Sequence, residues 1–263
     1  MRDYPPQEPF SEVGRRYHDE AMRLGDGIAA PLDVLYGDDP YQSLAVFPAA
    51  RPSGDVLLFW HGGGWTNGYK EWLYFMAPDL VASGVTFVSA GYRLAPQHLF
   101  PAGLDDAEAA LGWVRDHIGD HGGDPARVFI GGHSAGGHYA SLLAVGRRVG
   151  TVRGVLPISG VYLFGEGSGL STRPRFLGEG NEAAASPLPQ VRPGLPPFLI
   201  AHGDRDFPHL MRQAEDMERA LRAAGGTVER LVLPDCDHFQ ASYVSGQVEG
   251  PWLPRAVAWM RAL

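Results

Sequence analysis

The sequence contains one cysteine, Cys236, among its 263 residues. A single cysteine excludes a disulfide within the chain and is compatible with a reducing compartment. No segment approaches 18 uninterrupted apolar residues, so we expect no membrane-spanning helix. Residues 1–8 include no apolar stretch of the length that a signal peptide needs. From these absences we expect a soluble, cytoplasmic protein that does not act at a membrane.

Positive charge is also scarce. The chain carries 22 Lys and Arg against 30 Asp and Glu, which gives a net charge of −8. No basic run is longer than Arg147–Arg148, and a nucleic-acid surface needs clustered positive charge, so no nucleic-acid partner is expected. No His, Cys and Asp residues have the spacing of a metal site, and no G-x-G-x-x-G follows a first strand. We therefore expect neither a metal nor a cofactor.

Apolar runs alternate with helical patterns along most of the chain. Segments 32–36 and 42–47 alternate in polarity and predict an antiparallel hairpin at a sheet edge. The further strands expected are 56–60, 85–89, 127–130, 155–159, 197–201 and 228–233, and the helices expected are 69–83, 104–117, 210–224 and 254–262, with one more after Ser134. Strands alternating with helices predict an α/β fold with a mostly parallel sheet, covered on both faces, in one domain of residues 1–263.

Two segments fit this alternation poorly. Residues 1–30 are polar, with a short helix expected around 10–24, and they could form a surface arm or a partial cover over a site. Residues 161–196 are rich in Gly, Pro and Ser and have no clear periodicity. Long irregular segments of compact domains are often lids or binding loops. We therefore treat residues 161–190 as a candidate cap.

The motif Gly132-His133-Ser134-Ala135-Gly136 lies between an apolar run and an Ala- and Leu-rich run. Gly-x-Ser-x-Gly between a strand and a helix is the nucleophile elbow, which raises a serine hydroxyl above the end of a sheet. The turn is tight, so the two glycines must lack side chains. The helix N-terminus then favours negative charge that develops beside the serine. The pattern predicts Ser134 as a nucleophile.

A serine hydroxyl needs a base to take its proton and a carboxylate to orient that base. His238 follows the last predicted strand and is the candidate base, whereas His138 lies one helical turn beyond the serine and points elsewhere. Asp204 and Asp206 both follow the predicted strand 197–201. Asp206 lies farther into the loop and can reach His238, so it is the candidate acid.

Gly62-Gly63-Gly64 follows a buried strand directly. The oxyanion of a tetrahedral intermediate needs N–H donors that are already in place. Only glycines let the backbone approach a substrate closely enough. We expect the donors to be the N–H groups of Gly63, Gly64 and Ala135.

Aromatic residues near these motifs are candidates for the wall of a substrate pocket, although each could equally be a core residue. These candidates are Trp65, Tyr69, Tyr162, Phe164, Phe207 and Phe239, together with Trp72 and Phe176. An apolar wall of this kind suits a small organic substrate.

These motifs resemble those of serine esterases with the α/β-hydrolase fold. The segment 61–65 (HGGGW) matches the oxyanion motif of hormone-sensitive-lipase-like carboxylesterases and of arylformamidases (kynurenine formamidases). The segment 92–96 (YRLAP) is similar to the first group. His133 is closer to the second group, because the lipase-like group usually has Asp there. The resemblance implies an α/β-hydrolase fold with a triad of Ser134, Asp206 and His238.

The resemblance also implies a small-molecule ester or amide substrate and no cofactor. The segment before the glycine motif is shorter than the cap-bearing N-terminus of the lipase-like group, which suggests a minimal cap and a more open pocket. Three functions remain: hydrolysis of esters with short acyl groups, hydrolysis of an N-aryl formamide such as N-formylkynurenine, and non-catalytic ligand binding, as in the gibberellin receptors. The retained triad favours the enzymes, and the oligomeric state stays open, a homodimer included.

Overall fold

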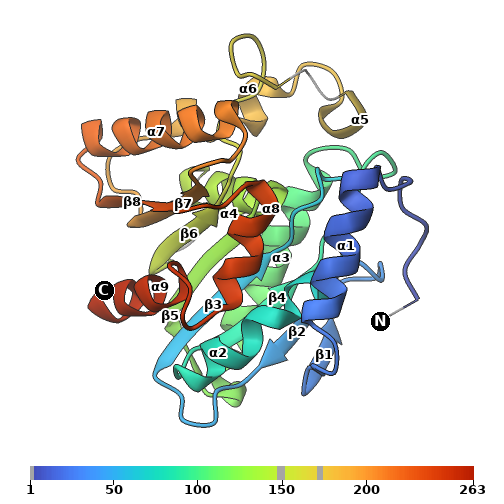
Figure 1. Cartoon of the computed structure of the whole chain (residues 1–263), viewed down its shortest axis with the longest axis vertical. Coiled ribbons are helices and arrows are strands. Elements are labelled where there is room, and N and C mark those ends of the chain that lie inside the picture. The colour runs from blue at the N-terminus through green and yellow to red at the C-terminus, as the bar shows by residue number, and fades with distance from the viewer. Residues whose placement is uncertain (1–2, 147–151, 171–173) are drawn as a thin grey trace.

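The structure, a computed structural model, describes residues 3–146, 152–170 and 174–263. Arg147–Arg148 and residues 171–173 of the expected cap lie outside the described residues. Within the described ranges, eight strands form one sheet in the order β1-β2-β4-β3-β5-β6-β7-β8 (Figure 1). They are β1 (Leu32–Leu35), β2 (Ser43–Phe47), β3 (Gly54–Trp60), β4 (Thr86–Ala90), β5 (Gly123–His133), β6 (Gly154–Ile158), β7 (Phe198–Gly203) and β8 (Val228–Leu233).

The sheet is mostly parallel. Strand β2 pairs antiparallel with β1 and β4, and β1 forms one edge, which confirms the expected hairpin at a sheet edge. The other neighbours pair in parallel from β4 through β3, β5, β6 and β7 to β8. The loops that follow β3, β5, β7 and β8 therefore emerge at one edge of the sheet, where ligands of such sheets bind.

Strand β6 contains a proline, which is unusual inside a sheet. It pairs with β7 at Val155–Phe198 and Ile158–Ala201, and Pro157 lies between these pairs. The N–H groups of Val155 and Ser159, on either side of the proline, bond to the chain of β7. Proline has no N–H to donate, so the ladder tolerates it where one bond is missing.

The described helices are α1 (Glu12–Leu24), α2 (Ala77–Ala82), α3 (Ala102–His117), α4 (Ala135–Val145), α5 (Pro174–Leu177), α6 (Glu182–Ala185), α7 (Pro208–Ala223), α8 (His238–Tyr243) and α9 (Leu253–Ala262). Short 3-10 helices are η1 (Lys70–Met76), η2 (Ile118–His121), η3 (Leu188–Gln190) and η4 (Val244–Gly246). The single helix expected over 69–83 is two elements, η1 and α2. Pro78 explains the break, because it cannot donate to a carbonyl one turn earlier.

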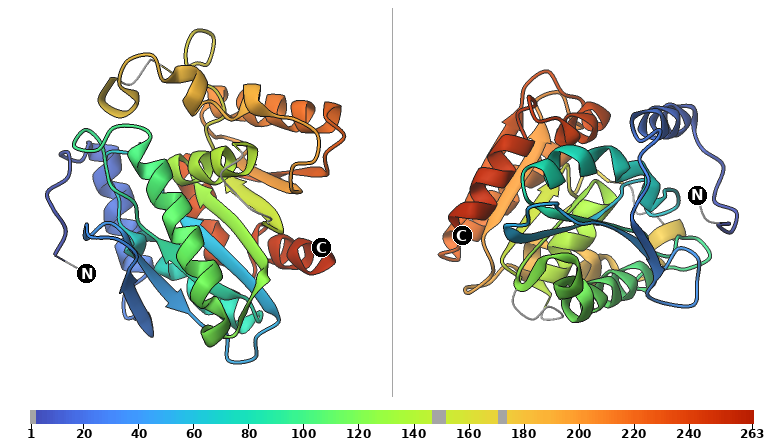
Figure 2. Two further views of the ribbon diagram at one scale, coloured as in Figure 1. Left: turned by 180° about the vertical axis from the view of Figure 1, so that it is seen from behind. Right: turned by 90° about the horizontal axis from the view of Figure 1, so that it is seen from below.

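Side chains of the central strands alternate between two apolar layers. Leu58 and Ile130 face a layer that contains residues of α3, α4 and α7. Leu57 and Phe129 face the opposite layer, which contains residues of α2 and α9. Figure 2 shows α2 and α3 on opposite sides of the sheet in the view from below. Both faces are therefore covered, as the continuous apolar strands require.

A buried lysine binds the chain before α1 to the edge of the molecule. Lys70 is the only lysine of the chain and its side chain is fully buried. Its ammonium group donates to the Tyr4 hydroxyl and to Glu71, both at 2.9 Å, and lies 3.2 Å from Asp33. The Tyr4 hydroxyl donates to Glu71 in turn. A buried charge needs such partners, so Tyr4 completes a set of contacts that holds the N-terminal segment in place.

Helix α1 runs along the outside of the molecule beside η1 (Figure 1). Tyr17 of α1 packs on the Trp72 ring at 5.1 Å, and its hydroxyl lies 2.9 Å from the Ser242 hydroxyl of α8. The Trp72 indole donates to His18 Nδ1 at 2.9 Å. The helix expected around residues 10–24 is thus present, and it bridges the segment after β3 to the segment after β8.

Candidate active site

The turn between β5 and α4 has the geometry of a nucleophile elbow. Ser134 has a φ of +54°, in the region that L-residues rarely adopt. A Cβ at Gly132 would lie 2.2 Å from the carbonyl carbon of Gly136. A Cβ at Gly136 would lie 2.0 Å from the carbonyl oxygen of Trp60. Both distances are too short for any side chain, so the two glycines are what lets the helix start against β3 and β5.

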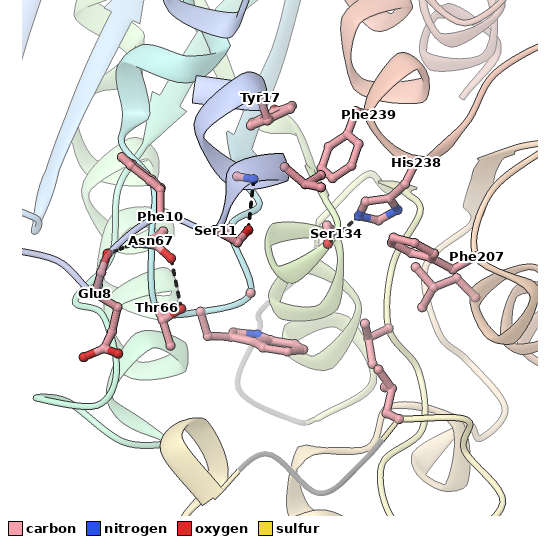
Figure 3. Close-up of a pocket in the computed structure, with 18 of the residues that line it drawn as sticks. Glu8, Phe10, Ser11, Tyr17, Thr66, Asn67, Ser134, Phe207, His238 and Phe239 are labelled. Carbon is pink, nitrogen blue, oxygen red and sulfur yellow. Dashed lines mark hydrogen bonds between the residues drawn. The ribbon is translucent and has the colours of Figure 1, made fainter. Parts of the chain in front are cut away.

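Ser134, His238 and Asp206 meet at the carboxyl edge of the sheet. His238 Nε2 lies 3.0 Å from Ser134 Oγ, and His238 Nδ1 lies 2.9 Å from Asp206 Oδ1. Figure 3 shows the imidazole facing the serine hydroxyl. The three residues come from the elbow, the loop after β7 and the start of α8. In this arrangement an imidazole can take the serine proton while a carboxylate fixes its tautomer.

Asp206 is buried and accepts three hydrogen bonds. Besides His238, its carboxylate accepts the Phe207 N–H at 2.7 Å and the Ser159 hydroxyl at 2.5 Å. Burial alone would raise the pKa of Asp206, but the bonds from His238 and Ser159 and the charge of His238 outweigh it and lower the pKa to about 2. The carboxylate is therefore ionised at neutral pH and faces the imidazole as an anion.

The alternative acid, Asp204, has a different partner. Its carboxylate accepts the N–H of Cys236 at 3.2 Å, within the loop that leads to His238. Another carboxylate near the histidine, that of Asp237, caps the N-terminus of α8 and accepts the N–H groups of Phe239 and Gln240. Both carboxylates thus shape the backbone around the histidine.

The glycine loop lies against the elbow. Gly63 and Gly64 have φ values of +108° and +61°, and both line the same cavity as Ser134. A Cβ at Gly63 would lie 1.9 Å from the carbonyl oxygen of Asn67, so no side chain fits there. Ala135 begins α4, where the first N–H groups of a helix have no partner within the helix. That these N–H groups bind an oxyanion remains a prediction.

A cavity of about 590 Å³ opens beside Ser134. Trp65, Phe207 and Phe239 lie in its wall, and so does Trp72. The other four aromatic candidates lie elsewhere. Tyr162, Phe164 and Phe176 are buried in the core layer of α4 and α7, and Tyr69 packs against the ring of Tyr4 at 5.0 Å. Their side chains fill the interior of the molecule or, for Tyr69, the contact with the N-terminal segment, so closeness in sequence to the site motifs did not place them in the wall.

The indole of Trp65 is held by a chain of hydrogen bonds behind the cavity. It donates to His138 Nδ1 at 3.1 Å, and His138 Nε2 donates to the carbonyl oxygen of Ala185 at 2.7 Å. The ring of Phe176 stacks on the indole at 4.2 Å, with an interplanar angle of 12°. His138 points away from Ser134, as expected, and it orients a wall of the cavity.

The sequence left open whether residues 1–30 cover a site, and in the structure some of them form part of the wall of the cavity. Phe10, Val13 and Tyr17 line the cavity from the N-terminal segment. Figure 3 shows Phe10 and Tyr17 on one side of Ser134 and Phe207 on the other. Arg175, from the expected cap segment, also lines the cavity and forms an ion pair with Glu8. Two segments far apart in sequence therefore meet over the cavity.

The described residues include no group of three or more His, Cys, Asp or Glu side chains that could hold a metal ion. Within the same part of the chain, no helix is both long enough and apolar enough to cross a membrane. Cys236 is buried and forms no disulfide.

Part of the chain matches a known protein family. Residues 57–176 match a family model described as the alpha/beta hydrolase fold, and this range includes the glycine loop and the elbow. The chain has the α/β-hydrolase fold. Its eight-stranded, mostly parallel sheet agrees with that assignment.

Named relatives of the chain include two esterases of Mycobacterium tuberculosis. The chain is 31% identical to esterase LipC over 78% of its own length and 32% identical to esterase LipQ over 80%. It spans 58% and 57% of the length of those two proteins. Among solved structures, a hyperthermophilic esterase of Pyrobaculum calidifontis superposes with a TM-score of 0.77 at 23% identity, covering 95% of this chain and 91% of that one. This last likeness shows the fold.

Three buried histidines are expected to make the stability of the chain depend on pH. Burial lowers the pKa of His61 and of His138 to about 4, and burial with the nearby charge of His238 lowers that of His133 to about 3. In the unfolded chain the pKa of each histidine is about 6.5. Below that pH the unfolded state binds more protons, so stability falls as the pH falls from about 6.5 to 4, by up to about 1.4 kcal/mol per pH unit for each proton.

Urea unfolding midpoints at pH 7.5, 6, 5 and 4 measure this effect. His138→Gln is the matched variant, because its amide can accept from Trp65 and donate to Ala185 without titrating. We expect the variant to take up about one proton fewer on unfolding. A midpoint that stays constant from pH 7.5 to 5 would show that the folded chain holds these histidines protonated.

Proposed function

We propose that the chain is a serine hydrolase that cleaves carboxylic esters with short acyl groups. The observation that supports this most is the continuous contact from Ser134 Oγ to His238 Nε2 at 3.0 Å and from His238 Nδ1 to Asp206 at 2.9 Å. Relatives named as esterases match this chain over about four fifths of its length. The chain spans less than two thirds of the length of those proteins, so their activity is a proposal for this chain.

In the first half of the reaction, Ser134 Oγ attacks the ester carbonyl carbon while His238 Nε2 takes the hydroxyl proton. The carbonyl oxygen becomes an oxyanion, which the N–H groups of Gly63, Gly64 and Ala135 bind. The carbon–oxygen bond to the alcohol then breaks, and His238 returns the proton to the leaving alcohol. The acyl group remains on Ser134 as an ester.

In the second half, a water molecule attacks the acyl carbon and gives its proton to His238. The bond to Ser134 Oγ breaks, the serine regains its proton from His238, and the acid leaves. Asp206 acts in both halves, because its anion stabilises the imidazolium that forms twice. Its low pKa, about 2, keeps the carboxylate ionised at any pH at which the imidazole works.

The size of the cavity supports a small substrate. About 590 Å³ lies in the range of pockets for small molecules, and it must hold the acyl and the alcohol groups together. Phe10 and Tyr17 on one side and Phe207 on the other restrict the space around Ser134. A long acyl chain would have to displace one of these segments.

A substrate series tests this proposal. We expect kcat/KM of p-nitrophenyl esters to be highest for acetate or butyrate and at least about tenfold lower for decanoate, since the aromatic side chains around Ser134 leave little room for the longer chain. Equal kcat/KM across the series would contradict the short-acyl assignment.

The second candidate, an arylformamidase, is tested in the same series. It is favoured by His133 at the elbow and by the aromatic wall of the cavity, which suits an aryl group. A kcat/KM for N-formylkynurenine above that of every ester would select it. Absence of turnover, together with absence of labelling of Ser134 by a fluorophosphonate, would select the non-catalytic ligand-binding protein instead.

A further inference from the structure

The residue before the nucleophile contacts the proposed base directly. His133 is the last residue of β5 and its side chain is buried, with 2% of its surface exposed. Its Nε2 lies 2.9 Å from the main-chain carbonyl oxygen of His238. The two imidazole rings lie 4.8 Å apart, centroid to centroid. Since a carbonyl oxygen can only accept, His133 Nε2 must carry the hydrogen and donate it.

The other ring nitrogen of His133 defines the form of the ring. Nδ1 is buried and has no hydrogen-bond partner among the described residues. It faces Gly62, where a Cβ would come within 2.9 Å of it. A second proton on Nδ1 would therefore meet backbone rather than an acceptor. Together with the bond to His238, this leaves one tautomer, with hydrogen on Nε2 and none on Nδ1.

The surroundings of His133 hold the ring in one orientation. Tyr17 of α1 stacks over it at 6.0 Å, with an interplanar angle of 22°. Gly62 of the glycine loop lies against its Nδ1 atom, and the ring of His238 lies beside it. Because the imidazole of His133 is held on several sides, it can keep the backbone of His238 at a fixed position relative to β5.

We propose that His133 is a positioning residue that ties the backbone of His238 to the strand carrying the nucleophile. The His238 side chain reaches Ser134 Oγ, and the His238 backbone is held by the residue next to Ser134. These two hydrogen bonds and the peptide bond between His133 and Ser134 form a closed ring of contacts. This ring sets the distance from His238 Nε2 to Ser134 Oγ. The inference rests on the proposed function, because that distance matters only if His238 takes the proton of Ser134.

Two variants of His133 separate the hydrogen bond from the packing. His133→Leu removes the donor and keeps an apolar side chain of moderate size, whereas His133→Gln keeps an N–H that can reach the same carbonyl. With p-nitrophenyl acetate we expect His133→Leu to lower kcat by about 10- to 100-fold with KM within about twofold, because a base displaced by a fraction of an ångström loses rate rather than affinity. We expect His133→Gln to stay within about threefold of the wild type.

Urea unfolding of each variant shows whether it is folded at the assay temperature. Equal losses of kcat in folded Leu and Gln variants would overturn the proposal, since packing alone would then explain the effect. A folded His133→Leu variant with wild-type kcat would also overturn it.

A second measurement does not depend on turnover. Nitrogen-15 NMR of the histidine rings should show His133 with hydrogen on Nε2 alone from pH 5 to pH 8. A His133 ring with hydrogen on Nδ1 would overturn the proposed link whatever the activity. Ser134→Ala in the same assays tests the function itself, so failure of the esterase proposal and failure of the His133 proposal give different results.

Discussion

Replacing Ser134 by alanine should lower kcat for p-nitrophenyl acetate by a factor on the order of 10⁴ to 10⁶. The variant loses the oxygen that attacks the carbonyl and keeps the rest of the cavity. Alanine has the same Cβ as serine, so the backbone at φ +54° should be equally tolerated and the fold retained. Initial rates, measured at an enzyme concentration well above that of any contaminating esterase, give the loss of kcat. A urea unfolding curve shows whether the fold is retained.

Ser141→Ala is the matched control for this prediction. Ser141 is buried in α4, two turns after Ser134, and its hydroxyl donates to the carbonyl of Gly137 inside the helix. It lies outside the cavity wall, so we expect kcat close to that of the wild type. A Ser134→Ala variant that retains wild-type turnover would remove Ser134 from the mechanism.

Asp206→Asn should lower kcat by about 10³- to 10⁴-fold while leaving KM similar. An amide is as large as the carboxylate, but it cannot stabilise an imidazolium. Its NH₂ group can also donate to the imidazole and favour the tautomer that places hydrogen toward Ser134. The effect acts on the transition state, so it appears in kcat and kcat/KM alike.

Two further variants provide comparisons for the loss of kcat in Asp206→Asn. Asp204→Asn replaces the other carboxylate of the same loop, which bonds to Cys236 rather than to His238, and should change kcat by no more than a few fold. Ser159→Ala removes the 2.5 Å hydrogen bond to Asp206 and should have an intermediate effect of about tenfold. If Asp204→Asn were the more damaging substitution, the acid would be assigned to the wrong residue.

The fold and the meeting of Ser134, Asp206 and His238 could be predicted because the signals for them are local. Each residue follows an apolar strand, and parallel strands bring their carboxyl ends to one edge. The elbow glycines are fixed by contacts within a few residues and with β3, which leave a clear pattern in the sequence. The hairpin 32–47 was equally readable from its alternation.

The contacts that support these residues could not be read in the same way. Ser159 follows β6 and bonds to Asp206, which lies in the loop after the neighbouring strand β7, and His133 bonds to the carbonyl of a residue 105 positions away. Neither contact leaves a periodic or compositional signal. The only available hint was position, since both residues end strands at the edge where the site lies.

The wall of the cavity was the least predictable part. In an irregular segment, the backbone conformation of one or two residues decides whether an aromatic side chain faces the cavity or the core. Tyr162 and Phe164 are examples, because both face the core. The role of Tyr17 depends on how α1 docks against Trp72 and Ser242, residues far along the chain. Amphipathic pattern predicts the helix but not its partner.

The most direct measurement is the intact mass of the protein after reaction with a fluorophosphonate, followed by mapping of the modified residue. The account predicts one phosphonyl group per chain, on Ser134, formed within minutes in the wild type and far more slowly in His238→Gln, whose side chain cannot act as the base. Unchanged labelling of His238→Gln, or modification of a residue other than Ser134, would contradict an activated Ser134.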